Sequence, residues 1–320
     1  MASPAVGASR IRRAAEGAMA VIHTAPPNAD AAPAAWRHPA WRRLMRSPLF
    51  WLGLGLLAFL LAFSFIGPHF YHKDVNTVDV ARSLLPPSAT FPLGTDVLGE
   101  NELGRLMIGG QVPIIAGFLC ACAAALVGGA VGVVSGFGGR AADASGMRLA
   151  DAVMSVPQVV AVLVGETVFG IRTPVLITVF ALTSWPLTAR LIRAETLSLR
   201  ARPFVEAARA SGSGRTALVL RHVLPNLLDP FVATFTAQFT NAILVIALTS
   251  YIGAGLGPPW NWATMINANR DALLSGQWWL IVLPGVLFAL LVNAVYLIGE
   301  AIRAAFNPQT YRRARRRSAA

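Results

Sequence analysis

Residues 201–226 read ARPFVEAARASGSGRTALVLRHVLPN, and this polar, arginine-rich stretch separates two long apolar regions of the chain. Pro203 suits the first turn of a helix and Gly212 suits a C-terminal stop, so one short helix is predicted between them. A second helix is predicted over about 215–224 and is expected to end at Pro225. A helix of roughly nine residues is marginal in water by itself. We therefore expect this loop either to dock on a partner or to lie on a membrane surface as an amphipathic loop.

Apolar segments dominate the chain on both sides of this loop. Of the 320 residues, 55% are hydrophobic and only 13% are charged, and the mean hydropathy is +0.57. A soluble domain usually carries about 25% charged residues. A helix needs roughly 20 apolar residues to cross the hydrocarbon core of a membrane. Six segments approach this length, four before the loop and two after it: 49–66, 112–137, 152–170, 174–189, 231–253 and 279–302.

These apolar segments are continuous runs rather than alternating patterns. In lipid, the backbone N–H and C=O groups of a spanning segment must be satisfied within the protein, and a continuous run achieves this as a helix. The strands of a membrane barrel instead alternate apolar and polar residues. The predicted fold class is therefore all-α, a polytopic membrane protein with six transmembrane helices.

The basic residues are distributed unevenly around the six segments. The chain has 27 Lys and Arg against 15 Asp and Glu, which gives a net charge of +12. Most of these basic residues lie near the two termini, after the second segment, and between the fourth and fifth segments. Cytoplasmic segments of membrane proteins carry such an excess. Both termini and the loop between the fourth and fifth helices are therefore predicted to be cytoplasmic, and the charge indicates a membrane partner rather than a nucleic acid.

The sequence divides into four predicted parts. Residues 1–45 are rich in Ala, Pro and Arg and are expected to form a disordered cytoplasmic tail. Residues 46–110 hold the first transmembrane helix and an extracytoplasmic segment. Residues 111–305 hold the other transmembrane helices, and 306–320 form a basic cytoplasmic tail.

The extracytoplasmic segment is predicted to contain one short amphipathic helix. Thr95 or Asp96 suits the N-cap position of that helix. Its apolar residues would be Leu98, Leu103, Leu106 and Met107. A helix of this kind is expected to lie in the outer interface of the membrane.

Four polar residues inside the predicted spans are candidate functional groups: Glu166, Gln238, Asn241 and Asn293. An intramembrane carboxylate is a functional candidate by default, but Glu166 alternatively reaches the outer interface or pairs with Arg172. The three amides either hydrogen-bond between helices, which the pattern favours, or line a polar path.

Small residues and prolines are expected to shape the packing of the spans. Pro157 and Pro186 should kink or break the third and fourth helices. Small residues crowd the second helix and allow close approach of a neighbouring helix. They are Gly117, Ala121, Ala125, Gly128, Gly129, Gly132 and Gly136.

The 201–226 stretch also contains a motif with a defined spacing. It resembles the EAA motif of the permeases of ABC importers, which reads Glu-Ala-Ala, three residues, Gly, nine residues, Ile, one residue, Leu-Pro. His222 stands where that motif has its apolar residue. The resemblance implies coupling to a partner ATPase through six residues: Glu206, Ala207, Ala208, Gly212, Leu224 and Pro225.

Further stretches resemble the C-type permease of dipeptide, oligopeptide and nickel importers, over about residues 92–308. They include Leu93-Gly94-Thr95-Asp96, the run 136–157, Arg193-Ala194-Glu195 and Ile252-Gly253-Ala254-Gly255-Leu256. The sequence departs from this family on the outer side. Glu100 and Asn101 stand where the family usually has Arg-Asp, and Gly109-Gly110-Gln111 stands where it has Gly-Ala-Arg.

The resemblance implies a multi-pass subunit in the cytoplasmic (inner) membrane of a prokaryote. Such a chain pairs with a homologous B-type permease to form the pathway for di- or oligopeptides or a similar small ligand. Two cytoplasmic ATP-binding subunits supply the energy, and an extracytoplasmic substrate-binding protein delivers the ligand. The loop around residues 206–212 would sit in a groove of one ATPase, and residues 111–305 would be the importer's transmembrane domain.

The sequence lacks the residues that other functions need. No Gly-x-x-x-x-Gly-Lys-Ser/Thr sequence is present, so ATP hydrolysis is assigned to the partner subunits and the chain is not expected to be an enzyme. The five histidines share no metal-ligand spacing, and neither a metal nor a cofactor is predicted. The alternative function is an ion-coupled secondary transporter or channel. That function needs coupling charges or an inverted repeat, and the sequence offers one candidate charge, Glu166, and no evident repeat.

Overall fold

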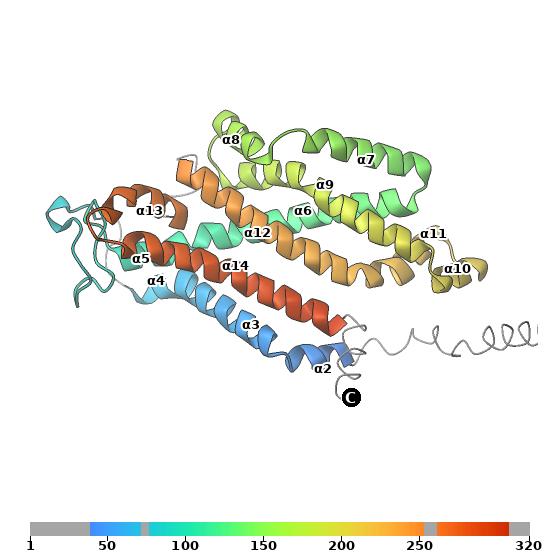
Figure 1. The fold of residues 1–320 in the computed structure, drawn as a ribbon, viewed down its shortest axis with the longest axis horizontal. Coiled ribbons are helices and arrows are strands. Elements are labelled where there is room, and N and C mark those ends of the chain that lie inside the picture. The colour runs from blue at the N-terminus through green and yellow to red at the C-terminus, as the bar shows by residue number, and fades with distance from the viewer. Residues whose placement is uncertain (1–38, 72–76, 253–260, 307–320) are drawn as a thin grey trace, which may run out of the picture. The chain divides into compact units, whose positions relative to one another are not determined.

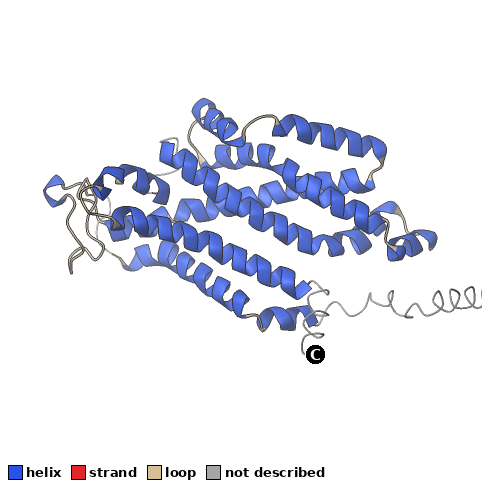
Figure 2. Cartoon of the chain, in the orientation of Figure 1, coloured by secondary structure: helices blue, strands red, loops and turns tan. Residues whose placement is uncertain are grey.

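The computed structural model describes residues 39–71, 77–252 and 261–306. Contacts divide the chain into two units, Met1–Pro39 and Ala40–Ala320, and the fold below is that of the second unit. Figure 2 shows that the described residues form helices joined by loops, and no strand occurs among them. The predicted all-α fold class is therefore confirmed for this part of the chain.

The helices of this unit range from single turns to helices of 28 residues. In chain order they are α2 (Pro39–Met45), α3 (Pro48–Leu61), η1 (Ala62–Ile66), α4 (Gly67–Phe70), η2 (Val80–Arg82), α5 (Glu102–Gly109), α6 (Gln111–Phe137), α7 (Arg140–Met154), α8 (Gln158–Phe169) and α9 (Thr173–Arg200). After them come α10 (Pro203–Ala210), α11 (Arg215–Leu218), η3 (Val219–Val223), η4 (Leu224–Leu227), α12 (Leu228–Ile252), α13 (Trp262–Ala268), η5 (Arg270–Leu273) and α14 (Trp279–Phe306).

Five helical stretches of the described chain are long and apolar enough to cross a membrane, or up to six if one bent pair counts as a span. The five are Pro48–Phe70, Glu102–Phe137, Thr173–Arg200, Arg215–Ile252 and Trp279–Phe306. The predicted tail, residues 1–45, falls mostly outside the described residues, and its last seven residues form α2. Residues 307–320 of the predicted basic tail also lie outside them.

The predicted third span, 152–170, is not one helix. It consists of the end of α7 and the whole of α8, which are bent by 74°. Pro157 lies at the break in an extended conformation, and a proline disfavours helical geometry in the residue before it. At 1.5 Å per residue, the 12 residues of α8 reach about 18 Å, short of the roughly 30 Å hydrocarbon core. The prediction of a kink or break at Pro157 is confirmed, and the bent pair of α7 and α8 stands where one interrupted span was predicted.

Two helices run further than predicted. The fourth continues through Pro186 as α9 to Arg200, where a span of 174–189 was expected. The helix predicted to end at Pro225 instead continues without a break from Arg215 to Ile252 through a π-helical turn and a 3₁₀ turn. Pro225 lies in the first turn of η4, where the missing N–H of a proline is tolerated.

The predicted helix of the outer segment also begins later than expected. Asn101 is the N-cap of α5 and accepts a hydrogen bond from the Gly104 N–H at 3.3 Å. Thr95, Asp96 and Leu98 therefore lie in the preceding loop. One face of α5 is buried within the protein, where the Trp262 indole donates to the Leu106 carbonyl at 2.7 Å. Its predicted position in the outer interface of the membrane stays a prediction.

Helices α6 and α9 pack closely along much of their length, and α12 lies between α6 and α14 in Figure 1. Three glycines spaced four apart on α6 face α9. A Cβ atom on Gly128 would lie 2.5 Å from the Trp185 oxygen, one on Gly132 2.7 Å from the Ala189 oxygen, and one on Gly136 2.7 Å from the Thr196 Cβ. The small residues therefore serve close helix packing, as the sequence predicts.

We expect Gly132→Val to lower the free energy of unfolding by about 1–3 kcal/mol, because the added side chain overpacks the α6–α9 interface. The backbone of α9 lies opposite this position and cannot move aside as a flexible side chain can. The matched control is Gly285→Val in α14, where nothing lies within 4 Å of the added Cβ. Thermal unfolding of the purified chains in detergent measures the difference, and equal melting temperatures would contradict the packing.

Candidate functional site

The first candidate site is the loop between α9 and α12, residues 201–227, called the 201–227 loop below. Its helix α10 begins with Pro203 in the first turn, as predicted. Gly212 closes the helix with φ of +84°, a conformation that favours glycine. The Gly212 N–H donates to the Arg209 carbonyl at 3.0 Å, and the Ser213 N–H donates to the Ala208 carbonyl at 3.1 Å.

The 201–227 loop is anchored to the long helices by an apolar cluster. Four of its residues are buried there: Val205, Leu218, Val223 and Leu227. They pack with Phe137 at the end of α6 and Ile192 of α9. The cluster therefore joins the 201–227 loop to the ends of α6 and α9 through packed side chains.

The opposite face of the 201–227 loop is open. Of the six residues that the EAA resemblance singles out, Ala208 is half-buried and the other five are exposed: Glu206, Ala207, Gly212, Leu224 and Pro225. Nothing lies within 4 Å of a Cβ built on Gly212. These residues thus share one loop, where small side chains allow a partner to approach closely and Glu206 presents an exposed carboxylate. Figure 1 shows α10 and α11 at the opposite end of the long helices from α5 and α13.

The second candidate site is a hydrogen-bonded network that joins α8, α9 and α12. The Gln238 side-chain amide donates to the Ser184 carbonyl at 2.9 Å and to the Thr188 hydroxyl at 3.0 Å. The Asn241 amide donates to the Gln158 side-chain oxygen at 2.9 Å. The Gln158 amide in turn donates to the Ser184 hydroxyl. Gln238 and Asn241 therefore hydrogen-bond between helices, which is the role favoured by the sequence.

Sequence reasoning missed three members of this network, Gln158, Ser184 and Thr188. The available signals were a glutamine directly after the helix-breaking Pro157, and a Ser and a Thr four residues apart on one helix. Asn293 does not join the network. It is exposed on α14 and donates to the Ala289 carbonyl of its own helix at 2.8 Å.

Glu166 is buried in α8, with 1% of its surface exposed. Within the described chain, neither of its carboxylate oxygens has a hydrogen-bond partner, and no ion pair joins it to Arg172. The alternative of an ion pair with Arg172 is therefore not found in the described chain, whereas the position of Glu166 relative to the outer interface stays a prediction. Glu166 remains a candidate intramembrane functional group.

We expect Gln238→Leu to lower the free energy of unfolding by about 1–3 kcal/mol, because Ser184 and Thr188 then lose a donor in a buried setting. Asn293→Leu is the matched control, since it removes an exposed amide that bonds only within α14. Thermal unfolding in detergent checks both variants. A control that loses as much stability as Gln238→Leu would contradict a specific role for the network.

A third group of polar residues lies in the outer segment and was not foreseen from the sequence. Arg105 of α5 pairs with Asp96 and Glu100, and all three side chains are buried. Burial raises the pKa of Glu100, Arg105 opposes that shift, and Asp96 adds to it. Glu102 is fully buried beside this cluster. Within the described residues, no group of three or more His, Cys, Asp or Glu is arranged to hold a metal ion.

Several apolar spans, a break in one of them, and an anchored loop between two others define a polytopic membrane protein. Residues 128–310 match the family of binding-protein-dependent transport system inner membrane components, and residues 36–87 match the N-terminal transmembrane domain of oligopeptide transport permease C. This chain belongs to the first of these families. It is a multi-pass protein of the inner membrane and a permease subunit of an ABC importer, so the predicted family and localisation are confirmed.

Similar proteins carry names that agree with this family. A protein of Brucella abortus biovar 1 named as a peptide permease is 37% identical over 259 residues, which cover 80% of this chain and 86% of that protein. The dipeptide transport system permease protein DppC of Bacillus subtilis is 28% identical over 274 residues, covering 85% and 86%.

The fold is also similar to a solved structure. That structure is an inward-facing form of the MetNI methionine ABC transporter, and it aligns with a TM-score of 0.52. The sequence identity is 20%, and the alignment covers 63% of this chain and 96% of the other. This likeness supports the permease fold of the chain.

Proposed function

We propose that this subunit forms one half of the pathway of an ATP-driven importer for di- or oligopeptides or a similar small ligand. Support for the substrate comes from the relatives named as peptide permeases. The pathway would be completed by a homologous B-type permease, and an extracytoplasmic binding protein would deliver the ligand. Residues 111–305 would form the transmembrane domain that lines this pathway.

The observation that carries the mechanism is the anchored and open 201–227 loop. Its inner residues are buried with Phe137 and Ile192, while Glu206 and Gly212 face outward. A cytoplasmic ATPase would dock on the outward face, and α10 would act as the coupling helix. Closure of the two ATPases on ATP would move α10, and the apolar anchor would pass that movement to α6 and α9.

The proposed orientation places both termini and the 201–227 loop in the cytoplasm. The arginines of this loop and of the terminal regions support that orientation. The segment 77–101 and α13 lie at the other end of the long helices in Figure 1, where the binding protein would dock. Cysteine accessibility in intact cells checks the orientation, since a cysteine at 207 should react only after the membrane is permeabilised.

Uptake by living cells tests the proposed function. A strain that lacks the gene would be compared with the same strain carrying it again, using labelled dipeptides, longer peptides and nickel, with and without ATP depletion. Restored uptake of one ligand class that stops on ATP depletion supports the proposal. Uptake that persists without ATP but stops when the ion gradient collapses would instead identify a secondary transporter.

The second candidate function requires a coupling charge inside the membrane, and the sequence offers Glu166. Glu166 is a buried carboxylate without a hydrogen-bond partner in the described chain, and a carboxylate inside a span is a functional candidate by default. Glu166→Gln separates the two functions. Loss of gradient-driven uptake in this variant would support ion coupling, whereas ATP-driven uptake at the wild-type level would leave the importer mechanism in place.

A further inference from the structure

Next to the exposed face of α10 lies a hollow of about 270 Å³ that the proposed ATPase docking does not account for. It is lined by Phe137, Arg200, Arg209, Ser213, Arg215 and Leu218. Phe137 and Leu218 are buried and form its apolar part, while the arginines and Ser213 are at least partly exposed. Its volume lies near the lower limit for small-molecule sites, roughly 300–1,000 Å³.

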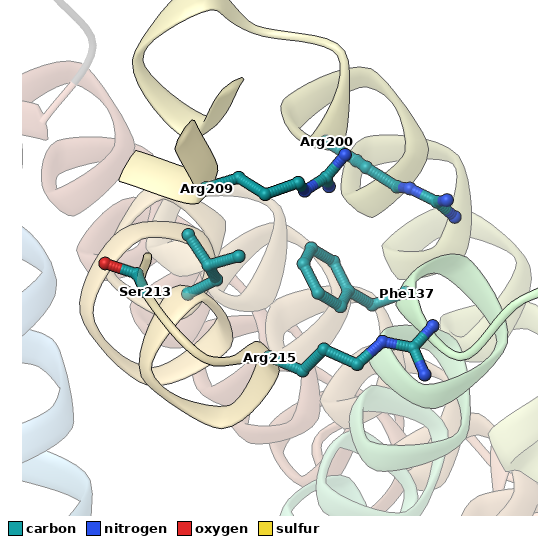
Figure 3. Close-up of a pocket in the computed structure, with 6 residues that line it drawn as sticks. Phe137, Arg200, Arg209, Ser213 and Arg215 are labelled. Atoms are coloured by element: carbon teal, nitrogen blue, oxygen red, sulfur yellow. The ribbon is translucent and has the colours of Figure 1, made fainter. Parts of the chain in front are cut away.

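Three elements bring one arginine each to this hollow. Arg200 ends α9, Arg209 lies on α10, and Arg215 begins α11. In Figure 3 the ring of Phe137 lies between the side chain of Arg215 and the side chains of Arg200 and Arg209. The Arg200 guanidinium lies 5.9 Å from the centroid of that ring. Stacking on an aromatic ring restricts a guanidinium group and orients its donors.

Among the residues that the structure describes, these three arginines lack the carboxylate partners that other arginines of α9 have. Arg193 pairs with Asp143, and Arg190 pairs with Asp151. Within the described residues, no ion pair involves Arg200, Arg209 or Arg215. Three like charges around one hollow repel each other, and an anion bound between them would relieve that repulsion.

The charge and the donor geometry define the ligand. A guanidinium group presents its N–H donors as a planar fork that fits two oxygens of a phosphate. Basic pockets between membrane helices bind lipid head groups in this way. We propose that this hollow is a binding site for a phosphate group, carried by an anionic phospholipid or by a soluble anion.

Such a ligand would connect parts of the chain that carry the proposed coupling. It would join the end of α9 and the start of α11 to Arg209, which lies on α10 itself. Occupancy of the hollow would therefore restrict α10 relative to the long helices. This site extends beyond the proposed function, because it requires neither an ATPase nor a transported substrate.

The test uses the full-length chain purified in a neutral detergent. Melting temperatures are measured against increasing short-chain phosphatidylglycerol, short-chain phosphatidylcholine or inorganic phosphate, at constant ionic strength. Wild type should be stabilised by phosphatidylglycerol, by inorganic phosphate or by both, and not by phosphatidylcholine. A response to phosphatidylglycerol alone assigns the site to a lipid head group, and a response to inorganic phosphate alone assigns it to a soluble anion.

Variants locate the binding. The double variant Arg200→Gln with Arg215→Gln should weaken the response roughly tenfold or more, since hydrogen bonds between charged groups are lost. Arg221→Gln is the control, because Arg221 lies in the same loop, is exposed and does not line the hollow. Should the double variant fail to fold, Arg200→Lys with Arg215→Lys keeps the charge but loses the planar fork, and it should still bind more weakly.

Two results would overturn the proposal. One is a wild-type chain whose melting temperature responds to neither phosphatidylglycerol nor inorganic phosphate. The hollow would then not bind a phosphate group, and an acidic segment of a protein partner would be the next candidate. The other is an equal loss of response in Arg221→Gln and in the double variant, which would show diffuse attraction to a basic surface. Neither result bears on ATP-driven uptake, so failure of this site is distinguishable from failure of the proposed function.

Discussion

Replacing Gly212 by alanine is expected to reduce ATP-driven uptake by about 5- to 30-fold while leaving the amount of protein in the membrane unchanged. Gly212 has φ of +84°, and the left-handed conformation costs an L-residue roughly 1–2 kcal/mol, which corresponds to that factor in an equilibrium. A steric clash is not the cause, because nothing lies within 4 Å of the added Cβ atom. This conformational free energy destabilises the turn that ends α10. That turn sets the direction in which the exposed face of α10 points.

Gly214→Ala is the matched control for this prediction. Gly214 lies two residues further along the same loop and is equally open, but its φ of −65° suits any residue. Uptake assays with both variants, together with co-purification of the ATPase, test the role of the turn. Equal uptake in Gly212→Ala, Gly214→Ala and wild type would remove the assignment of this loop as the coupling element.

Replacing Arg105 by glutamine is expected to lower the free energy of unfolding by about 3–5 kcal/mol, the usual cost of removing one partner from a buried ion pair. Asp96 and Glu100 would lose their shared cation while they remain buried close to each other and to Glu102. The outer loop would then separate from the start of α5. Chemical unfolding of the purified chain measures this loss.

The effect of Arg105→Gln should shrink at acidic pH. Burial raises the pKa of Glu100 and Arg105 opposes that rise, so this pKa is higher still in the folded variant that lacks Arg105. As pH falls, protonation of Glu100 therefore stabilises the folded variant more than folded wild type. Arg82→Gln is the control, because its ion pair with Asp79 is exposed and is worth at most about 1 kcal/mol. A loss of stability in Arg105→Gln no greater than that of the control would contradict a structural role for the buried cluster.

Local sequence was sufficient for several features of the site. Pro203 and Gly212 mark the ends of α10 because a proline fits the first turn and a glycine tolerates the left-handed turn that follows the helix. Pro157 marks the break between α7 and α8 for a similarly local reason, the restriction that a proline places on its own backbone and on its neighbour.

Other features depended on contacts between residues far apart in the sequence. Asn241 and Gln158 are 83 residues apart and meet only because α8 and α12 pack near each other. Pro225 did not end its helix because it lies in the first turn of a 3₁₀ helix that directly follows a π-helical turn, where its missing N–H is tolerated. The neighbouring residues Val223 and Leu227 are held in a packed cluster. Neither outcome can be read from the residue types alone.

The sequence by itself determined the membrane class, the approximate positions of the spans and the loop that carries the EAA spacing, because these follow from composition and short-range pattern. Tertiary structure alone decided which polar groups meet. It paired Arg105 with Asp96 and Glu100, buried Glu166 without a partner in the described chain, and gathered Arg200, Arg209 and Arg215 around one hollow. The physical reason is that the rotation and crossing of packed helices set these distances, and both depend on side-chain packing across the whole fold.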